Sequence, residues 1–455
     1  MIEPERIAPL NDEDVRDDGR YVLYWMQASQ REAYNHALEY AVKQANQLKR
    51  PVVACFGLTD EFPEANLRHY TFMLEGLCAT QAALAERGIQ LVVRRGSPPQ
   101  VAADLAAEAA MLVTDRGYLR VQKQWRFDLA GLVGCRAMQV ETDVVVPVDE
   151  ASDKEEYAAR TLRPKTHRLW DRYLAPMRRT HLRRDSLGLR LGGIAIDDTD
   201  AALKPLTIDR TVPPSPAFAG GTAQADKRLR RFVADRLAHY HERRNDPAGD
   251  WQSDMSPYLH FGQISPIAIA LAVRKADGVP DEAVDAYLEE LIVRRELSMN
   301  FVEHNPRYDA FESLPGWARA TLRQHARDHR PAEYSLEQLE RAETDDPYWN
   351  AAATEMRVTG KMHNYMRMYW GKRIIEWTAT PAEAFERAVY LNNRWELDGR
   401  DPNSFAGVAW CFGKHDRPWA ERSVFGTVRT MTAGGLERKF DMDAYAEKVR
   451  RLAER

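Results

Sequence analysis

The chain contains few cysteines, and those that it has are far apart. Four occur among 455 residues, at Cys55, Cys78, Cys135 and Cys411, and no two of them have the C-x-x-C spacing. We therefore expect neither a disulfide framework nor a zinc site, and no other metal site is predicted. A reducing, cytoplasmic location is expected instead.

Long apolar runs and the common nucleotide-binding motifs are also missing. No apolar run is long enough to cross a membrane, and the polar, acidic start "MIEPERIAPLNDED" is unlike a signal peptide. No G-x-G-x-x-G follows the first apolar run, and no G-x-x-x-x-G-K-[ST] is present. The net charge is −4. Any contact with nucleic acid must therefore come from a local basic patch, because the overall field is weak and slightly repulsive.

Alternating apolar and helical stretches occupy the first 150 residues. Five apolar runs predict buried strands, at residues 21–26, 51–58, 89–95, 109–115 and 144–148. Helical stretches lie between them, for example at 31–50 and 66–87. This alternation predicts an α/β domain over residues 1–150 with a doubly wound parallel sheet.

The rest of the chain divides into a linker and a helical region. Residues 151–225 are first strongly basic and then rich in Pro and Gly, which is typical of a linker that crosses the surface. We interpret the basic run as a solvated face rather than a DNA contact. Residues 226–455 show helical periodicity with short Pro- and Gly-containing breaks and no strand signal, and so predict an all-α domain. Two or three domains also suit a chain too long for one core.

Tryptophan is the one unusual feature of the composition. The chain has eleven, and seven of them fall between Trp317 and Trp419. In "NYMRMYWGKRIIEW" (364–377), Trp370 and Trp377 are seven residues apart, so they share a helix face and lie roughly 10 Å apart along its axis. Core packing is the usual explanation for such a stripe. Trp349, in "DDPYWN", supplies a third indole nearby in sequence.

Three further segments contain residues suited to chemistry. In 249–266, Ser253 and Ser256 precede a predicted helix start, where they act either as ordinary caps or as part of an anion site. In "EELIVRRELSMNF" (289–301), Glu290 and Arg294 are spaced i,i+4, which suits a simple ion pair or a ligand site. Residues 390–429 mix polar, aromatic and cationic side chains, a combination that suits an extruded nucleotide.

The order and spacing of these motifs resemble the photolyase/cryptochrome family over nearly the whole chain. The segments that carry the resemblance are "WQSDMSPYLHFG", "EELIVRRELSMNF", "TGKMHNYMRMYWGKRIIEW" and "LNNRWELDGRDPNSFAGVAWCFGKHDRPW". They look most like class II cyclobutane pyrimidine dimer photolyases. Val293 stands where other photolyase classes place a tryptophan, which also favours class II.

The resemblance implies FAD, bound in a U shape by the helical domain without a dinucleotide fingerprint. The implied contacts to its phosphates and ribityl chain are Tyr240, Ser253, Met255 and Ser256. The implied surroundings of the flavin ring are Arg294, Asn364, Arg367 and Asp398, with Arg367 and Asp398 as a buried ion pair. Asn392 is our choice for the side chain beside flavin N5, and Asn393 and Asn403 are alternatives.

The implied activity is light-driven repair of UV-damaged DNA. In the family, excited FADH⁻ transfers an electron to a pyrimidine dimer flipped out of the duplex, and the dimer splits. Glu290 is expected to contact the dimer, with Met368 and Trp410 lining the apolar side of its pocket. Trp370, Trp349 and Trp377 match the chain that photoreduces the flavin, with Trp377 nearest solvent. Lys414, Arg417 and Arg429 are the expected DNA-binding cations.

Several alternatives stay open at this point. An antenna chromophore, either 8-hydroxy-deazaflavin or a folate, is possible but not identified. A cryptochrome-like photoreceptor shares the fold and the flavin. A (6-4) photolyase would need pocket histidines, for which His260 and His363 are the candidates. A flavin-free DNA-binding module would need none of the tryptophans. We expect the protein to be a monomer.

Overall fold

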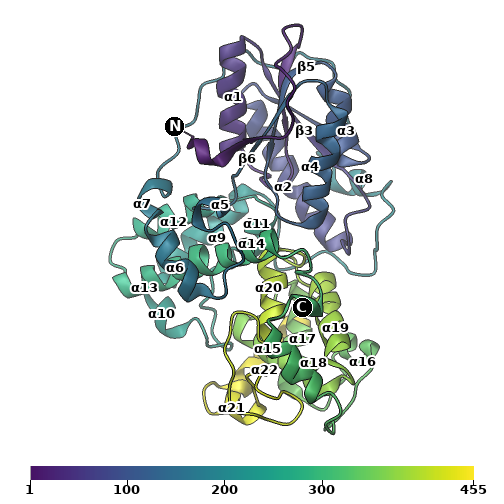
Figure 1. Ribbon diagram of the computed structural model, residues 1–455, viewed down its shortest axis with the longest axis vertical. Helices are drawn as coiled ribbons and strands as arrows, with labels where there is room; N and C mark the ends of the chain where they lie inside the picture. Colours follow the sequence, from purple (N-terminus) through teal and green to yellow (C-terminus); the bar gives the residue numbers. More distant parts are fainter. Residues whose placement is uncertain (1, 455) are drawn as a thin grey trace.

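The computed structural model describes residues 2–454, and Figure 1 shows an α/β domain above two helical lobes. Six strands form one sheet in the order β1-β6-β5-β2-β3-β4. Strand β1 is antiparallel to β6, and the other neighbours are parallel. The strands are β1 (Ile7–Pro9), β2 (Tyr21–Trp25), β3 (Val52–Leu58), β4 (Gln90–Arg95), β5 (Ala109–Asp115) and β6 (Arg136–Val140).

Helices cover both faces of this sheet. They are α1 (His36–Leu48), α2 (Leu67–Ala85), α3 (Pro98–Ala106) and α4 (Arg120–Leu132). On the central strand β2, Tyr21, Leu23 and Trp25 join the core formed with α3 and α4, whereas Val22 and Tyr24 join the core formed with α1 and α2. Alternate residues of a strand point to opposite faces, so a run buried on both faces reads as continuously apolar. The predicted α/β fold with a doubly wound sheet is confirmed.

Four of the five predicted strands are present, and the fifth prediction was wrong. Residues 144–148 are buried but form no strand. Their backbone instead turns toward the helical domain, where Glu296 accepts hydrogen bonds from the amides of Val145 (2.5 Å) and Val146 (3.2 Å). The last strand is β6, which the sequence pattern missed because Arg136 and Gln139 interrupt its apolar character.

Short helices connect the α/β domain to the helical region. They are α5 (Val148–Ala151), α6 (Ala159–His167), α7 (Trp170–Tyr173) and α8 (Thr199–Leu203). Helix α6 packs on the first helical lobe, and α8 packs on α2. The segment predicted as a surface linker therefore carries helices that contact both domains.

Two hydrophobic cores divide the helical region into two lobes (Figure 1). The first lobe contains α9 (Thr222–Asp235), α10 (Tyr240–Arg243), α11 (Ser256–His260), α12 (Pro266–Arg274), α13 (Asp281–Leu288) and the π-helical turn η3 (Glu289–Arg294). The second lobe contains α14 (Arg295–His304), α15 (Gly316–Gln324), α16 (Leu336–Arg341), α17 (Pro347–Thr359), α18 (Asn364–Trp377), α19 (Pro381–Trp395), α20 (Pro402–Cys411), α21 (Ala433–Glu437) and α22 (Met442–Ala453). The continuous run α13–η3–α14 joins them.

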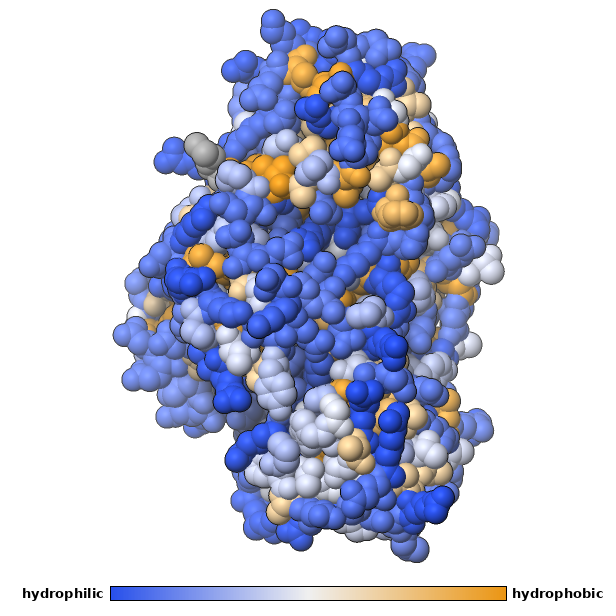
Figure 2. All heavy atoms as spheres, in the orientation of Figure 1, coloured by the Kyte–Doolittle hydropathy of each residue, from blue (hydrophilic) through white to orange (hydrophobic). Residues whose placement is uncertain are grey.

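The surface in view in Figure 2 is mostly hydrophilic, with apolar side chains gathered mainly over the α/β domain. Within residues 2–454, no helix combines the length and the apolar character needed to span a bilayer.

Candidate flavin and DNA site

A cleft opens between the two helical lobes, and we call it the helical cleft. Its volume is about 610 Å³. Polar side chains from both lobes face it. The lining residues are Tyr240, Ser253, Met255, Ser256, Leu259, Tyr287, Glu290, Leu291, Arg295, Asp398, Asp401 and Asn403. The four residues predicted to hold phosphates and a ribityl chain thus come together on one wall.

The loop before α11 presents the serines of this wall. Asp254 lies between them with a positive φ of 59° and pairs with Lys361 of the second lobe. Burial opposes the charge of Asp254, but Lys361 outweighs it and lowers the pKa of that carboxyl. Helix α11 has only five residues, so Ser253 and Ser256 offer hydroxyl groups here rather than a strong helix dipole.

The π-helical turn changes which charges pair near the cleft. Arg294 reaches Glu289 at 3.2 Å, and not Glu290 as the i,i+4 spacing predicted. A π-turn bonds residue i to i+5, so it brings Glu289 rather than Glu290 beneath Arg294. Glu290 is left lining the cleft with about a third of its side chain exposed, 3.5 Å from Arg244 of the first lobe.

This turn also separates Arg294 from the cleft. The guanidinium of Arg294 lies 5.2 Å from the centre of the Trp410 ring on α20. Arg295, the next residue, lines the cleft and donates to the carbonyl of Asp143 at 2.6 Å. Arg295 was missed because the family resemblance named its neighbour, Arg294. Tyr287, Asp401 and Leu259 were also missed, and no sequence signal marked them.

A cluster of buried charges lies behind the cleft. Arg367 of α18 contacts Glu396 at 3.1 Å and Asp398 at 3.6 Å. Burial opposes the charge of Arg367, but Glu396 and then Asp398 outweigh it and raise its pKa. Burial raises the pKa of Glu396 to about 8, although Arg367 acts in the opposite direction. The predicted pair of Arg367 with Asp398 is therefore part of a triad that includes Glu396.

Four buried polar atoms in this region have no hydrogen-bond partner among the described residues. They are Nε of Arg367, Oε2 of Glu396, Oδ1 of Asp398 and Oδ1 of Asn392. Buried polar groups in folded proteins are nearly always paired, so such a group of unpaired atoms indicates that something polar binds beside them.

The three candidate asparagines differ in which side-chain atoms are free to bind a ligand. Asn392 is buried, and its amide nitrogen donates to Ser404 at 2.7 Å, which leaves its oxygen free. Asn393 donates to Glu64 of the α/β domain and accepts from the amide of Arg400. Asn403 lines the cleft. Asn364, predicted beside the flavin ring, is exposed at the start of α18.

The three predicted tryptophans form a continuous array in the second lobe. The rings of Trp370 and Trp349 are stacked at 9° with centroids 6.4 Å apart, and Trp349 meets Trp377 at 5.4 Å. The Trp349 indole also donates to the carbonyl of Trp370 at 3.0 Å. Trp377 was expected near solvent, but it is only 3% exposed because Tyr334 and Arg373 cover it.

The predicted pocket and DNA residues lie on α18, α20 and the loop that follows α20. Met368 lies 3.9 Å from the sulfur of Cys411. Arg417 and Arg429 each place a guanidinium 5.0 Å from the ring centre of Trp419, which is 40% exposed. Lys414 is buried, paired with Glu155 and donating to the carbonyl of Ser313, so its ammonium does not face solvent as a DNA-binding cation would.

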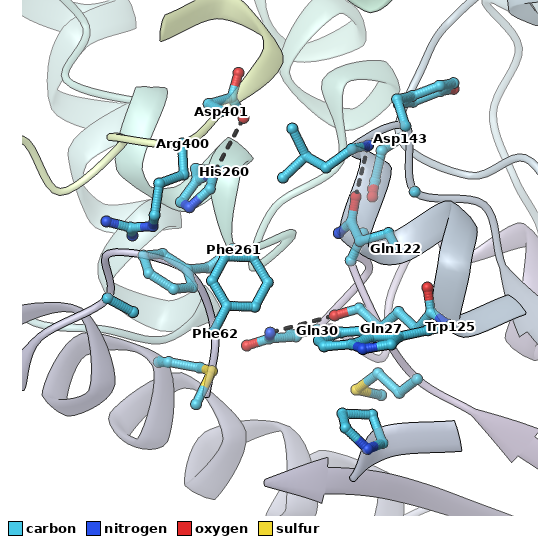
Figure 3. Close-up of a pocket in the computed structure, with 18 of the residues that line it drawn as sticks. Gln27, Gln30, Phe62, Gln122, Trp125, Asp143, His260, Phe261, Arg400 and Asp401 are labelled. Carbon is cyan, nitrogen blue, oxygen red and sulfur yellow. Dashed lines mark hydrogen bonds and ion pairs between the residues drawn. The ribbon is translucent and has the colours of Figure 1, made fainter. Parts of the chain in front are cut away.

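A second hollow, which we call the junction pocket, lies between the α/β domain and the helical region. Its volume is about 1030 Å³. Figure 3 shows the rings of Phe62, Trp125 and Phe261 around it, with Gln27 and Gln30 at its base. Gln27 leaves both ends of its amide unpaired, and Gln30 leaves its oxygen unpaired, within the described part of the chain.

Comparison with known proteins now places the chain in a family. Residues 22–181 match the family model described as DNA photolyase. A relative named deoxyribodipyrimidine photo-lyase, from Methanothermobacter thermautotrophicus, is 53% identical over 452 residues, which cover 99% of each chain. The chain therefore belongs to the DNA photolyase family, and it is an enzyme of the lyase class, as the sequence motifs predicted.

Solved structures show the same fold. A class III photolyase from Agrobacterium tumefaciens matches with a TM-score of 0.73 at 20% identity, over 95% of this chain and 86% of that one. An archaeal photolyase from Sulfolobus tokodaii, described as holding two FAD molecules, matches with a TM-score of 0.69 at 14% identity, over 94% and 89%. Across residues 2–454, no group of three or more His, Cys, Asp or Glu side chains is arranged to hold a metal ion.

Proposed function

We propose that the protein is a class II photolyase that splits cyclobutane pyrimidine dimers in UV-damaged DNA, with FAD in the helical cleft. The observation that carries the proposal is the set of unpaired buried atoms on Arg367, Asp398 and Asn392. Arg367 stands three residues before Trp370 of the stacked tryptophan array on α18. Bound FAD in its reduced form supplies the light-driven electron that opens the dimer. The relatives' shared name supports the same activity.

The residues of the cleft would hold FAD by charge and shape. Tyr240, Ser253, Met255 and Ser256 form the wall for its phosphates and ribityl chain. Arg367 would offset negative charge on the reduced ring, and the free oxygen of Asn392 would accept a hydrogen bond from a ring N–H. Arg295 adds a second cation to the cleft. We infer that Arg294 and Asn364 act at the rim, in accordance with their places outside the cleft lining.

The side of the cleft carrying Glu290 would receive the lesion. Glu290 is partly exposed there and would accept a hydrogen bond from a pyrimidine N–H. Trp410 and Met368 would give the apolar side, with Arg294 fixed over the Trp410 ring by Glu289. A damaged pair costs less to extrude from the stack than an intact pair, which favours dimers over normal DNA.

The loop after α20 would bind the phosphates of the DNA backbone. Arg417 and Arg429 are exposed beside Trp419, so two cations and one indole are available to phosphates and bases. Lys414 would support this loop from inside rather than touch DNA, because Glu155 and Ser313 already hold it.

The tryptophan array would deliver the electrons that convert oxidised flavin to its active form. Indole loses an electron more readily than most side chains, and the rings of Trp370, Trp349 and Trp377 lie within 6.4 Å of each other along the series. Their burial within one lobe fixes these separations.

The junction pocket would hold a second, light-harvesting chromophore. Its aromatic rings suit a flat conjugated group. The unpaired amide of Gln27 and the unpaired amide oxygen of Gln30 suit a heterocycle edge such as that of a deazaflavin, a second flavin or a folate. The Sulfolobus protein, which holds two FAD molecules, supports two cofactor sites on this fold.

A light-dependent repair assay tests the proposal. Reduced, flavin-loaded protein is mixed with UV-dimerised oligothymidylate and illuminated, and thymine absorbance is followed against a dark control. Recovery only in the light is expected, and Glu290→Gln should reduce it by weakening the contact to the lesion. Flavin binding without recovery would favour a photoreceptor or a (6-4) photolyase. Purified protein that binds no flavin would overturn the proposal.

A further inference from the structure

Four successive carbonyl groups at the end of α19 accept hydrogen bonds from side chains outside that helix. Asn66, Arg68 and His69, at the N-cap and in the first turn of α2, are buried and donate to three of them. Their respective acceptors are the carbonyls of Arg394 (2.7 Å), Trp395 (2.8 Å) and Glu396 (2.9 Å). Arg400 donates to the fourth, the carbonyl of Asn393, at 2.8 Å. We call Asn66, Arg68 and His69 the α2 clamp.

The neighbours of His69 fix the state of its ring. The Nδ1 atom accepts from the Asn66 amide at 3.1 Å, so Nε2 carries the hydrogen that reaches the Glu396 carbonyl. Burial, and then the charge of Arg400, lowers the pKa of His69 well below its usual value. The ring is therefore neutral near pH 7, and it acts as a fixed donor to the end of α19.

Arg68 joins the ends of two helices without a carboxylate partner. Besides Trp395 on α19, its guanidinium donates to the carbonyls of Met356 (3.2 Å) and Arg357 (2.6 Å) in the last turn of α17. The free carbonyls at a helix C-terminus carry partial negative charge, so the two helix ends together stabilise this buried cation. Burial lowers the pKa of Arg68 to about 10, although Glu396 acts in the opposite direction, so Arg68 keeps its charge at neutral pH.

Both helix ends lead directly into the buried charge cluster behind the helical cleft. Glu396 follows α19, whereas Met362 follows α17 and donates its amide to Oε1 of Glu396 at 3.2 Å. The same Oε1 lies 3.1 Å from Arg367. Asn392, with its unpaired oxygen, stands one turn earlier on α19. Contacts that hold the ends of α17 and α19 therefore also hold the atoms that would face a flavin.

We propose that the α2 clamp positions Arg367 and Asn392 beside the flavin and thereby sets the reduction potential of the bound FAD. This inference rests on the proposed function, in which Arg367 offsets the negative charge of reduced FAD. It makes the α/β domain part of the flavin site, although the residues that line the helical cleft all come from the helical region.

Loss of the clamp should lower the reduction potential. Buried carbonyls at the end of α19 would lose their partners, and the last turn of the helix would move to find others. Glu396 lies in that segment, and Arg367 would follow it because the two are paired at 3.1 Å. Reduced FAD would then lose part of the positive charge that compensates its own, while oxidised FAD would lose less.

Two substitutions of His69 separate positioning from mere stability. His69→Phe keeps a planar ring of similar size but removes the donor to the Glu396 carbonyl. His69→Gln places an amide nitrogen close to the position of Nε2, and so can restore that hydrogen bond. If the clamp acts by positioning, the second variant should recover what the first one loses.

A contact elsewhere on the domain boundary provides a matched control. Lys123 of α4 donates to the carbonyl of Glu303, in the last turn of α14, at 2.8 Å. It is thus another side chain of the α/β domain that binds the C-terminal end of a helix in the helical region. The carboxylate of Glu303 pairs with Arg116 and Lys123, both in the α/β domain, and not with the buried charge cluster. Lys123→Met removes this contact.

The measurement is the two-electron midpoint potential of bound FAD, by spectroelectrochemical titration of the purified, flavin-loaded protein. For His69→Phe we expect a loss of roughly tenfold in the preference for reduced over oxidised FAD, which corresponds to a midpoint about 30 mV lower. His69→Gln should recover most of this change, and Lys123→Met should leave the potential unaltered. The denaturant midpoint is measured alongside, because a merely structural role would lower it without moving the potential.

The outcomes separate this inference from the proposed function. An unaltered potential in folded, flavin-loaded His69→Phe would overturn the role of the clamp and leave light-driven repair standing. An equal shift in Lys123→Met would overturn it as well, because any loosening of the domain boundary would then suffice. A shift confined to His69→Phe in a protein that repairs no dimers would support the clamp and contradict the proposed function. Protein that binds no flavin would contradict both.

A milder substitution decides the matter if His69→Phe does not fold. Asn66→Ala removes the donor to the Arg394 carbonyl and leaves the His69 ring in place. We expect a smaller fall in the midpoint potential, in the same direction. No shift in folded, flavin-loaded Asn66→Ala would overturn the role of the clamp.

Discussion

The helical cleft and the junction pocket share a wall but differ in chemistry. Leu259, Arg295 and Asp401 line both hollows. The helical cleft is smaller, and it presents three carboxylates, several hydroxyls and the guanidinium of Arg295. The junction pocket is larger, and it presents aromatic rings, methionines and amides beside charged side chains such as Arg400 and Asp143 (Figure 3). Under the proposed function, the helical cleft would hold the flavin, which changes charge, and the junction pocket would hold a group that only absorbs light.

The physical reason is the cost of buried charge. A reduced flavin carries negative charge, which needs a fixed cation because a low-dielectric site does not solvate it. In the proposed function Arg367 would provide that cation, and it is itself held by Glu396 and Asp398. A light-absorbing group keeps its charge, so stacking and a few hydrogen bonds suffice to orient it. The first two of four predictions test this division between the two hollows, and the other two concern the DNA loop and the contact between the domains.

Replacing Arg367, the buried cation, should lower both the stability of the protein and its FAD content. Arg367→Met leaves Glu396 and Asp398 buried without their partner, and removal of one member of such a group costs about 3–5 kcal/mol. We expect purified protein with little FAD and a lower denaturant midpoint. Arg341→Met, which removes an exposed pair with Glu337, should cost about 0–1 kcal/mol. Full flavin content in Arg367→Met would contradict the role of this cluster.

Removing an aromatic wall should affect only the junction pocket. Trp125→Ala takes away the ring that meets Phe62 at 5.9 Å, and loss of one stacking ring costs a bound flat group about 1–3 kcal/mol. A second chromophore added to the protein should bind more weakly, while the FAD content stays the same. Phe127→Ala, on the exposed side of the same helix, is the control. Equal loss of both chromophores would show that the hollows are not independent.

The DNA loop lies beyond both hollows and should act on binding alone. Arg417→Ala removes one cation beside Trp419, so the slope of log affinity against log salt should fall by about 0.9 if Arg417 meets one phosphate. Titration of dimer-containing DNA at several salt concentrations measures the slope. Arg451→Ala on α22 serves as a control of equal charge. An unchanged slope in Arg417→Ala would exclude a phosphate contact.

The contact between the domains should respond to pH. Burial raises the pKa of Glu296 from 4.5 to about 8, although the amides of Val145 and Val146 act in the opposite direction. A raised pKa in the folded state means that the stability from protonated Glu296 is full below pH 4.5 and is lost as the pH rises through 8. Glu296→Gln keeps an oxygen for both amides and does not titrate.

The stabilities of the unaltered protein and of the Glu296→Gln variant should therefore diverge as the pH changes. The denaturant midpoint of the unaltered protein should fall relative to that of Glu296→Gln between pH 4.5 and 8. Glu312→Gln changes an exposed position, so its denaturant midpoint should follow the same pH dependence as that of the unaltered protein. Parallel curves for Glu296→Gln as well would show that Glu296 is charged throughout this range.

Local patterns were enough to predict the architecture but not the details of the cleft. Four strands and the helical domain followed from periodicity. The family motifs named all four residues on the cleft wall that contains Ser253 and Ser256. The π-turn was invisible to helix counting, so the i,i+4 spacing paired Glu290 with Arg294 instead of Arg244. The family resemblance named Arg294 and did not name Arg295, which lines the cleft. Lys414 was predicted to face DNA, because nothing nearby in sequence shows that Glu155 covers it.

The sequence by itself determined four strands of the sheet, the helical character of the second half and the spacing of Trp370 and Trp377, because each depends on residues within a few turns or one strand. Only the tertiary structure decided that Trp349 stacks on Trp370, that Tyr334 packs against Trp377 and that Glu396 joins Arg367. Each of these contacts joins two different segments of the chain rather than two positions on one helix. Their geometry depends on how helices pack, and helix packing is set by the whole set of buried side chains rather than by any local pattern.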